Sequence, residues 1–205
     1  MTYVKASVRR PAGNPGNGIQ PKDQLVIYDV DDILYFPPRN EAGVVIEEDI
    51  VMKAGRYAIG IYLTPGTAEI SSNSDGETDA EGYTPSVKFN HPGNEQEIRE
   101  FKTNWLSKKC IVVLRYCSGK PADLIGTPCN PSKLSVSYTG SNESNTNELT
   151  FTQISKGDDI AIYRGTDTLE EPVAVVEAGA TDIDYQTDGQ YQLSAGAAKI
   201  AGVTG

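Results

Sequence analysis

The sequence is poor in the residues that most catalytic and metal sites require. It has one histidine, His91, and three cysteines, Cys110, Cys117 and Cys129, without CxxC spacing. A zinc site would need carboxylates to complete its ligand set, and we expect the thiols to be structural or idle in a reducing compartment. A serine triad would have to use His91, which lies at an expected strand-to-helix corner. We therefore expect no enzymatic activity, no metal and no cofactor.

Positive charge and long apolar runs are also scarce. Lysine and arginine number 18 against 28 aspartates and glutamates, which gives a formal net charge of −10 and a pI near 4.6. This charge balance argues against a protein that binds DNA phosphates through a basic surface, but it suits a surface that DNA slides past. No run is long enough to span a membrane, and the N-terminus lacks a signal-peptide apolar segment. We expect no membrane partner.

One helix is indicated, at about residues 94–108. Asn94 is a favourable N-cap residue, and Glu97 three positions later completes the pattern of a capping box. Its apolar residues recur at helical spacing and form one stripe, Ile98, Phe101, Trp105 and Leu106. We expect this helix to cover a β core.

Most of the remaining chain is typical of strands separated by turns. The expected strands are residues 24–36, 44–46, 50–52, 57–63, 87–90, 110–116, 133–138, 148–154, 159–163 and 173–176, with a terminal hairpin from 182–185 and 190–193. Residues 133–138 and 148–154 alternate apolar and polar positions and predict an antiparallel hairpin. Gly60 indicates a bulge or a close approach. The fold class is mainly β, a β-sandwich or barrel flanked by one α-helix.

Composition divides the chain into three regions. Residues 1–24 are rich in proline and glycine and are expected to be a flexible arm, or one that orders against a neighbouring subunit. Residues 25–165 form the β domain, in which the polar, acidic range 69–84 is expected to be a mobile loop or hairpin tip. Residues 166–205 are a C-terminal β extension of unassigned role with a frayed end.

Two acidic segments could carry chemistry. The strand ending in Asp29 and Asp31 resembles the first motif of haloacid dehalogenase-type phosphatases, in which the first aspartate attacks phosphorus and the second is the acid/base. Lys156, Asp158 and Asp159 could mimic that family's later lysine and magnesium-binding acids. The phosphatase fold, however, needs repeated βα units, and one helix is indicated here. The simpler interpretation is a strand that enters an acidic turn.

The second segment is the acidic part of the range 69–84. Its carboxylates could hold Ca²⁺, although it lacks the ligand ladder of an EF-hand, and a solvated loop is the simpler interpretation. These carboxylates are Asp75, Glu77, Asp79 and Glu81. A third reading is a glycan-binding β-sandwich in which tyrosines form a platform; Trp105 on an apolar stripe argues against it.

The chain resembles the major tail tube proteins of tailed bacteriophages, in versions from phages and prophages of Bacteroidetes hosts. The resemblance covers about residues 25–163. It rests on the acidic loop followed by a strand and PGNEQEIREF, on Gly126-Thr-Pro128-Cys-Asn-Pro131, and on the segment Lys133–Tyr163 with its Asn-rich tip. None of these motifs is a catalytic signature.

The resemblance implies a virion structural protein that assembles with itself into stacked, hexameric rings forming a tail tube for DNA ejection. It also implies tape measure, tail terminator and baseplate proteins as partners, and the virion tail as location after assembly in the host cytoplasm. Ring and stacking contacts are expected from residues 1–24, 69–84 and 140–147. An acidic lumen would let DNA pass without binding. Its expected lining is drawn from Asp29, Asp31, Asp32, Asp75, Glu77, Asp79 and Glu81.

Overall fold

The computed structural model describes residues 6–14, 16–18, 20–117, 119–142, 144–169, 175–176 and 192–193. The chain divides into two compact units, Met1–Leu169 and Glu170–Gly205. The described residues of the second unit form a short parallel pair, β13 (Val175–Val176) and β14 (Gln192–Leu193). The expected strand 182–185 lies outside the described residues, so the predicted terminal hairpin stays a prediction.

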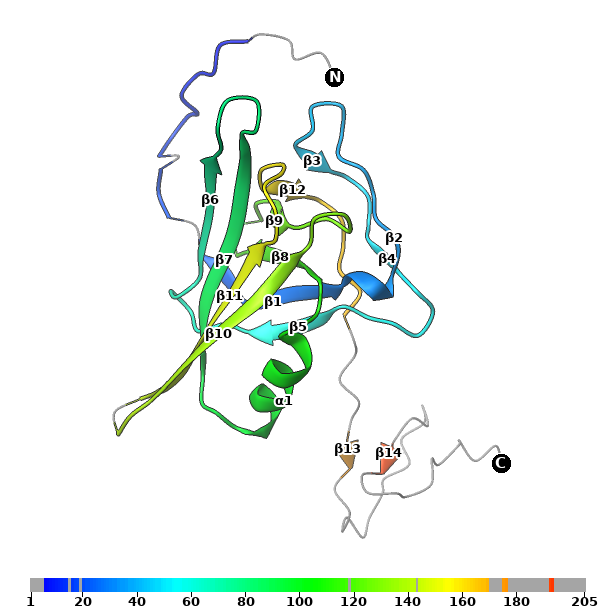
Figure 1. Cartoon of the computed structure of the whole chain (residues 1–205), viewed down its shortest axis with the longest axis vertical. Coiled ribbons are helices and arrows are strands. Elements are labelled where there is room, and N and C mark those ends of the chain that lie inside the picture. The colour runs from blue at the N-terminus through cyan, green and yellow to red at the C-terminus, as the bar shows by residue number, and fades with distance from the viewer. Residues whose placement is uncertain are drawn as a thin grey trace. The chain divides into compact units, whose positions relative to one another are not determined.

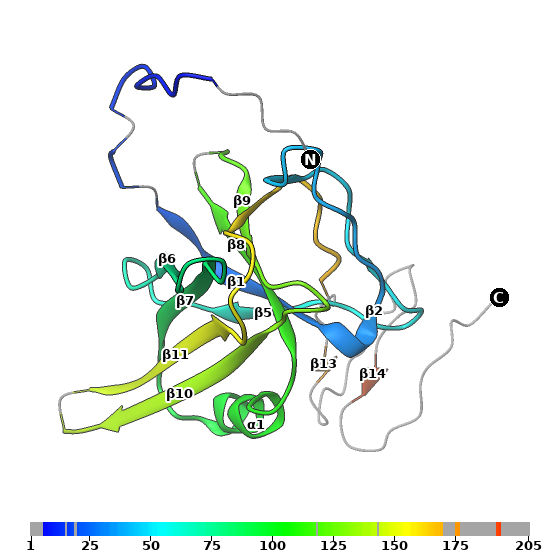
Figure 2. The ribbon, with the colours of Figure 1, turned by 45° about the horizontal axis from the view of Figure 1, so that its top comes forward.

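The first unit is mainly β and is built on one mixed sheet of ten strands (Figures 1 and 2). The strand order is β3-β12-β9-β8-β10-β11-β7-β6, and β1 pairs with both β8 and β5. All these pairs are antiparallel except β3 with β12. The strands are β1 (Pro21–Asp29), β3 (Val45–Ile46), β5 (Ile59–Tyr62), β6 (Glu69–Asp75), β7 (Gly82–Pro92), β8 (Cys110–Tyr116), β9 (Ala122–Ile125), β10 (Ser132–Gly140), β11 (Asn145–Gln153) and β12 (Ala161–Tyr163).

The paired strands β1 and β8 are buried on both faces. Successive side chains of a strand point to opposite faces, and here each face meets its own apolar cluster. Leu25, Ile27, Val112 and Leu114 belong to one cluster, with β5, β7, β10 and β11. Val26, Tyr28, Ile111 and Val113 belong to the other, with β9, β12 and residues around β3. This two-sided burial explains why both segments are nearly continuous apolar runs.

The sheet curls around the first cluster without closing into a barrel. The turn after β5 reaches β7, where the Thr64 N–H donates to the Asn90 carbonyl at 2.8 Å and the Asn90 N–H donates to Thr67 Oγ1 at 3.1 Å. Within the described residues no strand ladder joins β5 to β6 or β7. The barrel form of the prediction is therefore not found, whereas the mainly β class is confirmed, with a single α-helix among the described residues.

The helix is shorter than predicted and begins differently. Helix α1 spans Gln96–Trp105, and its N-cap residue, Glu95, makes no side-chain capping hydrogen bond. The predicted capping box is wrong because Asn94 Oδ1 instead accepts a hydrogen bond from Lys102 Nζ at 3.1 Å, and the same ammonium donates to Asn147 Oδ1 at 2.6 Å. This tertiary network occupies the side chain that the sequence assigns to the cap.

Three members of the predicted apolar stripe face the core. Ile98 is buried, and Phe101 and Trp105 pack against the first cluster with their rings stacked at 5.7 Å between centroids. Leu106, the fourth, is 54% exposed because it lies just beyond the helix end. The helix thus covers the core with a narrower stripe than expected.

The predicted strand 24–36 is two strands separated by a turn. Asp29 ends β1, Val30–Asp32 form the 3₁₀ turn η1, and Ile33–Tyr35 form β2, which pairs with β4 (Val51–Met52) in a separate ribbon. Asp29 Oδ1 accepts the Asp31 N–H at 3.1 Å, so a local side-chain cap breaks the strand that apolar patterning favoured. Strand β9 was not predicted, because its four residues lie in a stretch dominated by turn residues.

Two other details bear on surface features. Gly60 is paired in continuous register with Val26, so no bulge occurs there, but a Cβ at Gly60 would lie 2.0 Å from Gln24 Nε2, which confirms the close approach. The acidic range 69–84 is largely strand, because β6 and β7 pair from Glu69 with Lys88 to Asp75 with Gly82. Only residues 76–81 form the hairpin turn.

Candidate functional site

Asp29 and its neighbours form a hydrogen-bonded turn. The Asp29 side chain is 8% exposed. Its Oδ2 accepts a hydrogen bond from the ammonium of Lys108, and its Oδ1 accepts one from the Asp31 N–H. The hydrogen bond that Lys108 donates to Asp29 raises the pKa of the Lys108 ammonium. Asp32 pairs with Arg56 at 3.4 Å, and the Asp31 carbonyl accepts Lys53 Nζ at 2.5 Å. Both carboxylate oxygens of the candidate nucleophile are therefore occupied by partners that fold the turn.

The other residues of the phosphatase pattern have separate partners. Lys156 pairs with Asp75 at 3.1 Å, Asp158 lies 3.9 Å from Arg39, and Asp159 accepts the Ser72 hydroxyl at 2.5 Å. In the described part of the chain, no hydrogen bond or ion pair joins any of them to Asp29 or Asp31. The sequence motif is thus distributed over two unconnected polar groups.

The β6–β7 turn is an acidic, folded tip. A Cβ on Gly76 would lie 2.2 Å from the Ala80 carbonyl oxygen, and the Ala80 N–H donates to the Glu77 carbonyl at 2.9 Å. The hydrogen bond with Lys156 lowers the pKa of the Asp75 carboxyl, and the positive charge of Lys156 lowers it further. A hollow of about 530 Å³ beside the turn is lined by Ser74, Asp75, Gly76, Glu81, Gly82 and Tyr83. Among the described residues, no group of three or more His, Cys, Asp and Glu side chains is arranged to hold a metal ion.

His91 lies on β7 at the strand-to-helix corner, as the sequence predicted. It is opposite Asn147 in the β7–β11 register, and its ring meets Tyr62 edge-on with centroids 6.2 Å apart. Its Nδ1 is buried without a hydrogen-bond partner, and burial lowers the pKa of the imidazole. The ring is packed as part of the sheet surface.

The three cysteines are free thiols in different surroundings. Cys110 is buried at the start of β8, and burial raises the pKa of its thiol to about 12. Cys117 and Cys129 are exposed. Cys110 therefore behaves as a core residue at neutral pH.

The β10–β11 hairpin projects from the sheet, as Figures 1 and 2 both show. It is paired from Ser132 with Gln153 to Gly140 with Asn145, so the predicted hairpin is confirmed and its turn is shorter than the expected range 140–147. The described turn residues are polar and exposed. The pairing of Thr146 with Pro92 and of Thr152 with Ser86 places this turn and the β6–β7 turn at opposite ends of the β7–β11 pair.

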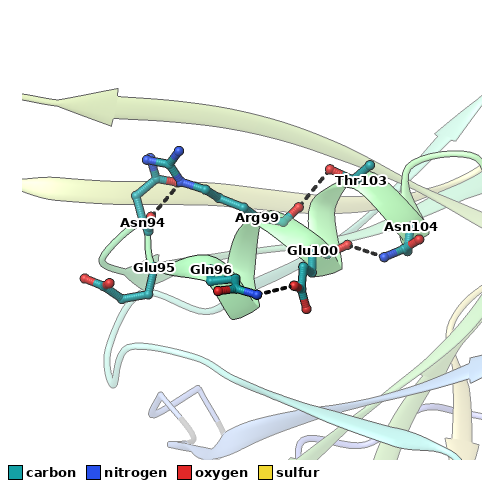
Figure 3. Close-up of a pocket in the computed structure, with 7 residues that line it drawn as sticks. All are labelled: Asn94, Glu95, Gln96, Arg99, Glu100, Thr103 and Asn104. Atoms are coloured by element: carbon teal, nitrogen blue, oxygen red, sulfur yellow. Dashed lines mark hydrogen bonds between the residues drawn. The ribbon is translucent and has the colours of Figure 1, made fainter.

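The outer face of α1 borders a shallow hollow of about 590 Å³ (Figure 3). Its polar groups bond to one another: Arg99 Nε donates to the Asn94 carbonyl at 2.8 Å, and Gln96 Nε2 donates to Glu100 Oε1 at 2.7 Å. Asn104 Nδ2 likewise donates to the Glu100 carbonyl at 2.8 Å. These groups stabilise the helix, and none of the labelled bonds converges on a common point.

A polar network that the sequence did not predict fixes the end of the first unit. Asp167 accepts the Tyr28 hydroxyl at 2.6 Å and the Arg115 guanidinium, and Arg115 also donates to the Gly165 carbonyl at 2.7 Å. Asp49 Oδ1 accepts the Thr166 N–H at 2.7 Å. Residues 166–169, expected to begin the C-terminal extension, are thereby tied to the first unit. Tyr28 and Arg115 are 139 and 52 positions away from Asp167, so no local sequence pattern predicts these contacts.

Comparisons with known proteins return no relative: no family model matches the chain, and neither a curated protein nor a solved structure does. In the part of the chain that the structure describes, no helix is long and apolar enough to cross a membrane.

Proposed function

We propose that the protein is a structural virion protein, the tail tube subunit of a tailed bacteriophage or prophage, which assembles with itself into stacked, hexameric rings. The observation that carries the proposal is the contrast between a dense two-sided core and the polar segments that extend from it. These segments are the arm up to residue 20, the β6–β7 turn and the β10–β11 turn. Enzymes bind their substrates in pockets, whereas these exposed segments are available for contacts to other subunits.

The sheet supports the same proposal. β5, β6 and β3 each pair on one side only within the described residues, and unpaired strand edges favour association with another chain. Ring closure converts such edges into contacts between subunits. Apolar clusters on both sides of β1 and β8 support the sandwich architecture of the proposed fold.

The acidic balance suits a conduit for DNA. With a net charge of −10, a lumen lined by carboxylates would repel phosphates and let the genome pass without tight binding. Asp29 and Asp32 are the weaker candidates for the lining, because they are engaged with Lys108 and Arg56. Tape measure, tail terminator and baseplate proteins are the partners that this function entails. Assembly takes place in the host cytoplasm, and the product is the virion tail.

Electron microscopy of negatively stained protein at high concentration tests the proposal. We expect rings or tubes with a central hole. A protein that stays monomeric at every concentration and salt condition would contradict the proposed function. Incubation with a generic phosphomonoester and Mg²⁺, beside Asp29→Asn, tests the phosphatase alternative: turnover that the substitution abolishes would establish it.

Exposed tyrosines favour a second candidate, a glycan-binding module. The side chains on β2, β5, β7 and β10 and in the segment before β5 are between 41% and 49% exposed: Tyr35, Tyr57, Tyr62, Tyr83 and Tyr138. Tyrosine rings are suited to stacking on sugars as well as to protein interfaces. Binding to a glycan array by a persistent monomer would favour this candidate over the tube.

A further inference from the structure

The N-terminal arm and the body of the protein differ sharply in charge. Three of the 18 basic residues and none of the 28 acidic ones lie in the first 20 positions, which precede β1. The basic residues are Lys5, Arg9 and Arg10. The arm is thus a cationic segment attached to a strongly anionic body, an asymmetry that indicates a charge-complementary binding partner.

The described arm does not use its own body as that partner. Every described residue from Ala6 to Gln20 is exposed, and Val8 is 96% exposed. Among the contacts of the described residues, Arg10 donates within the arm, to the Gly13 carbonyl at 3.4 Å, and neither Arg9 nor Arg10 forms an ion pair. Docking within one molecule would have covered these side chains, so the arm is free to bind outside its own chain.

The β6–β7 hairpin offers a matching surface. β6 is the terminal strand of the sheet path, so within the described residues its outer edge has unpaired backbone groups, which accept an added extended segment. The exposed Glu77 and Glu81 lie at the adjoining turn, and neither has an ion pair among the described contacts. Tyr83 lines the hollow there and is 41% exposed, which provides a ring face for a guanidinium.

We propose that the N-terminal arm of one copy docks along the β6 edge and the β6–β7 turn of a second copy, with Arg9 and Arg10 against Glu77, Glu81 and Tyr83. Arg9 lies twelve positions before Pro21, where β1 begins, and an extended segment of that length spans roughly 40 Å. The arm is therefore long enough to bridge from its own sheet to a neighbour. This inference specifies the contact that joins copies in the proposed tube.

Charge reversal of full-length protein tests the docking. We expect Arg9→Glu with Arg10→Glu, and separately Glu77→Lys with Glu81→Lys, to weaken self-association in sedimentation equilibrium at least about tenfold, because attraction is replaced by like-charge repulsion. The matched control for the hairpin variant, Glu41→Lys with Glu95→Lys, changes the net charge by the same amount and sign at exposed sites away from the hairpin turn. Circular dichroism spectra should be unchanged in all three variants.

Mixing separates docking between copies from a non-specific charge effect. The arm variant keeps the wild-type hairpin, and the hairpin variant keeps the wild-type arm. An equimolar mixture should therefore form heterodimers, although each variant alone self-associates weakly. A chain that carries all four substitutions should recover self-association, because the swapped charges again attract. Unchanged association of the arm variant, or no heterodimer in the mixture, would overturn the inference.

The inference and the proposed function can fail independently. If the wild-type protein forms tubes and the arm variant forms them equally well, the docking is wrong and the tube proposal stands. If the arm-dependent pairing occurs but no ring or tube appears at any concentration, the docking stands and the tube proposal is wrong.

Discussion

The β6–β7 and β10–β11 hairpins each have an inner part, which packs in the core, and an outer part at the turn. Both parts belong to the same strands but differ in polarity and burial. On β11, Leu149 and Phe151 are fully buried, whereas Asn145 at the outer end is exposed. On β7, Val87 and Phe89 are buried, whereas the turn that precedes Gly82 is acidic and exposed. The comparison shows how a single strand pair can contribute to stability at one end and remain available for contacts at the other.

The largest effect on the free energy of unfolding is expected from a substitution in the inner part of the β10–β11 hairpin. Phe151 is fully buried and its ring is stacked against Phe89 with centroids 6.4 Å apart. Phe151→Ala should lower the free energy of unfolding by about 3–5 kcal/mol, because it removes apolar contacts and leaves a cavity. Thr150→Ala, on the opposite face of β11, is the control and should change it by less than about 1 kcal/mol. Urea unfolding followed by Trp105 fluorescence measures both, and equal effects would contradict the assignment of faces.

The next effect concerns the network at the end of the first unit. Asp167→Ala should cost about 3 kcal/mol, because it leaves the Arg115 guanidinium and the Tyr28 hydroxyl without their partner. Asp158→Ala, which removes an exposed carboxylate 3.9 Å from Arg39, should cost less than about 1 kcal/mol. Thermal unfolding of the two variants compares them; a similar loss in both would show that the network does not hold residues 166–169 in place.

A smaller, pH-dependent effect is expected at His91. Burial lowers the pKa of the folded imidazole below the ordinary 6.5, so the unfolded chain binds the proton more readily. His91 therefore reduces stability as the pH falls through and below that ordinary value, and contributes no such loss above it. His91→Phe keeps an aromatic ring beside Tyr62 and should reduce the decline in unfolding free energy between about pH 7.5 and pH 5.5. An identical decline in both proteins would contradict the burial of the imidazole.

The sequence predicted the buried parts of this molecule better than its polar connections. β8 coincides with the expected range 110–116, and the β10–β11 hairpin was found, because apolar alternation follows from burial on a pleated sheet. The capping box at Asn94 and the continuous strand through Asp29 were wrong, because Lys102 and the Asp31 N–H compete for those side chains. Such choices depend on residues distant in sequence or on local caps that override patterning.

The candidate site was predictable only in composition. The acidity of the range 69–84 is visible in the sequence, but its arrangement as an edge strand with a short turn depends on pairing with β7. The Asp167 network depends on residues from three separate segments and has no sequence signature. Local pattern therefore identified which segments are polar, and tertiary pairing decided which of them remain available for contacts.

We expect the β6–β7 turn to contribute to assembly and not to folding. Asp75 and Gly82 are register partners, so residues 76–81 can be replaced by a two-residue Asn-Gly turn without losing a strand pair. We predict that this variant keeps the wild-type free energy of unfolding to within about 0.5 kcal/mol yet forms no tubes by electron microscopy under conditions in which the wild type does. Tubes of normal appearance from the variant would contradict the claim.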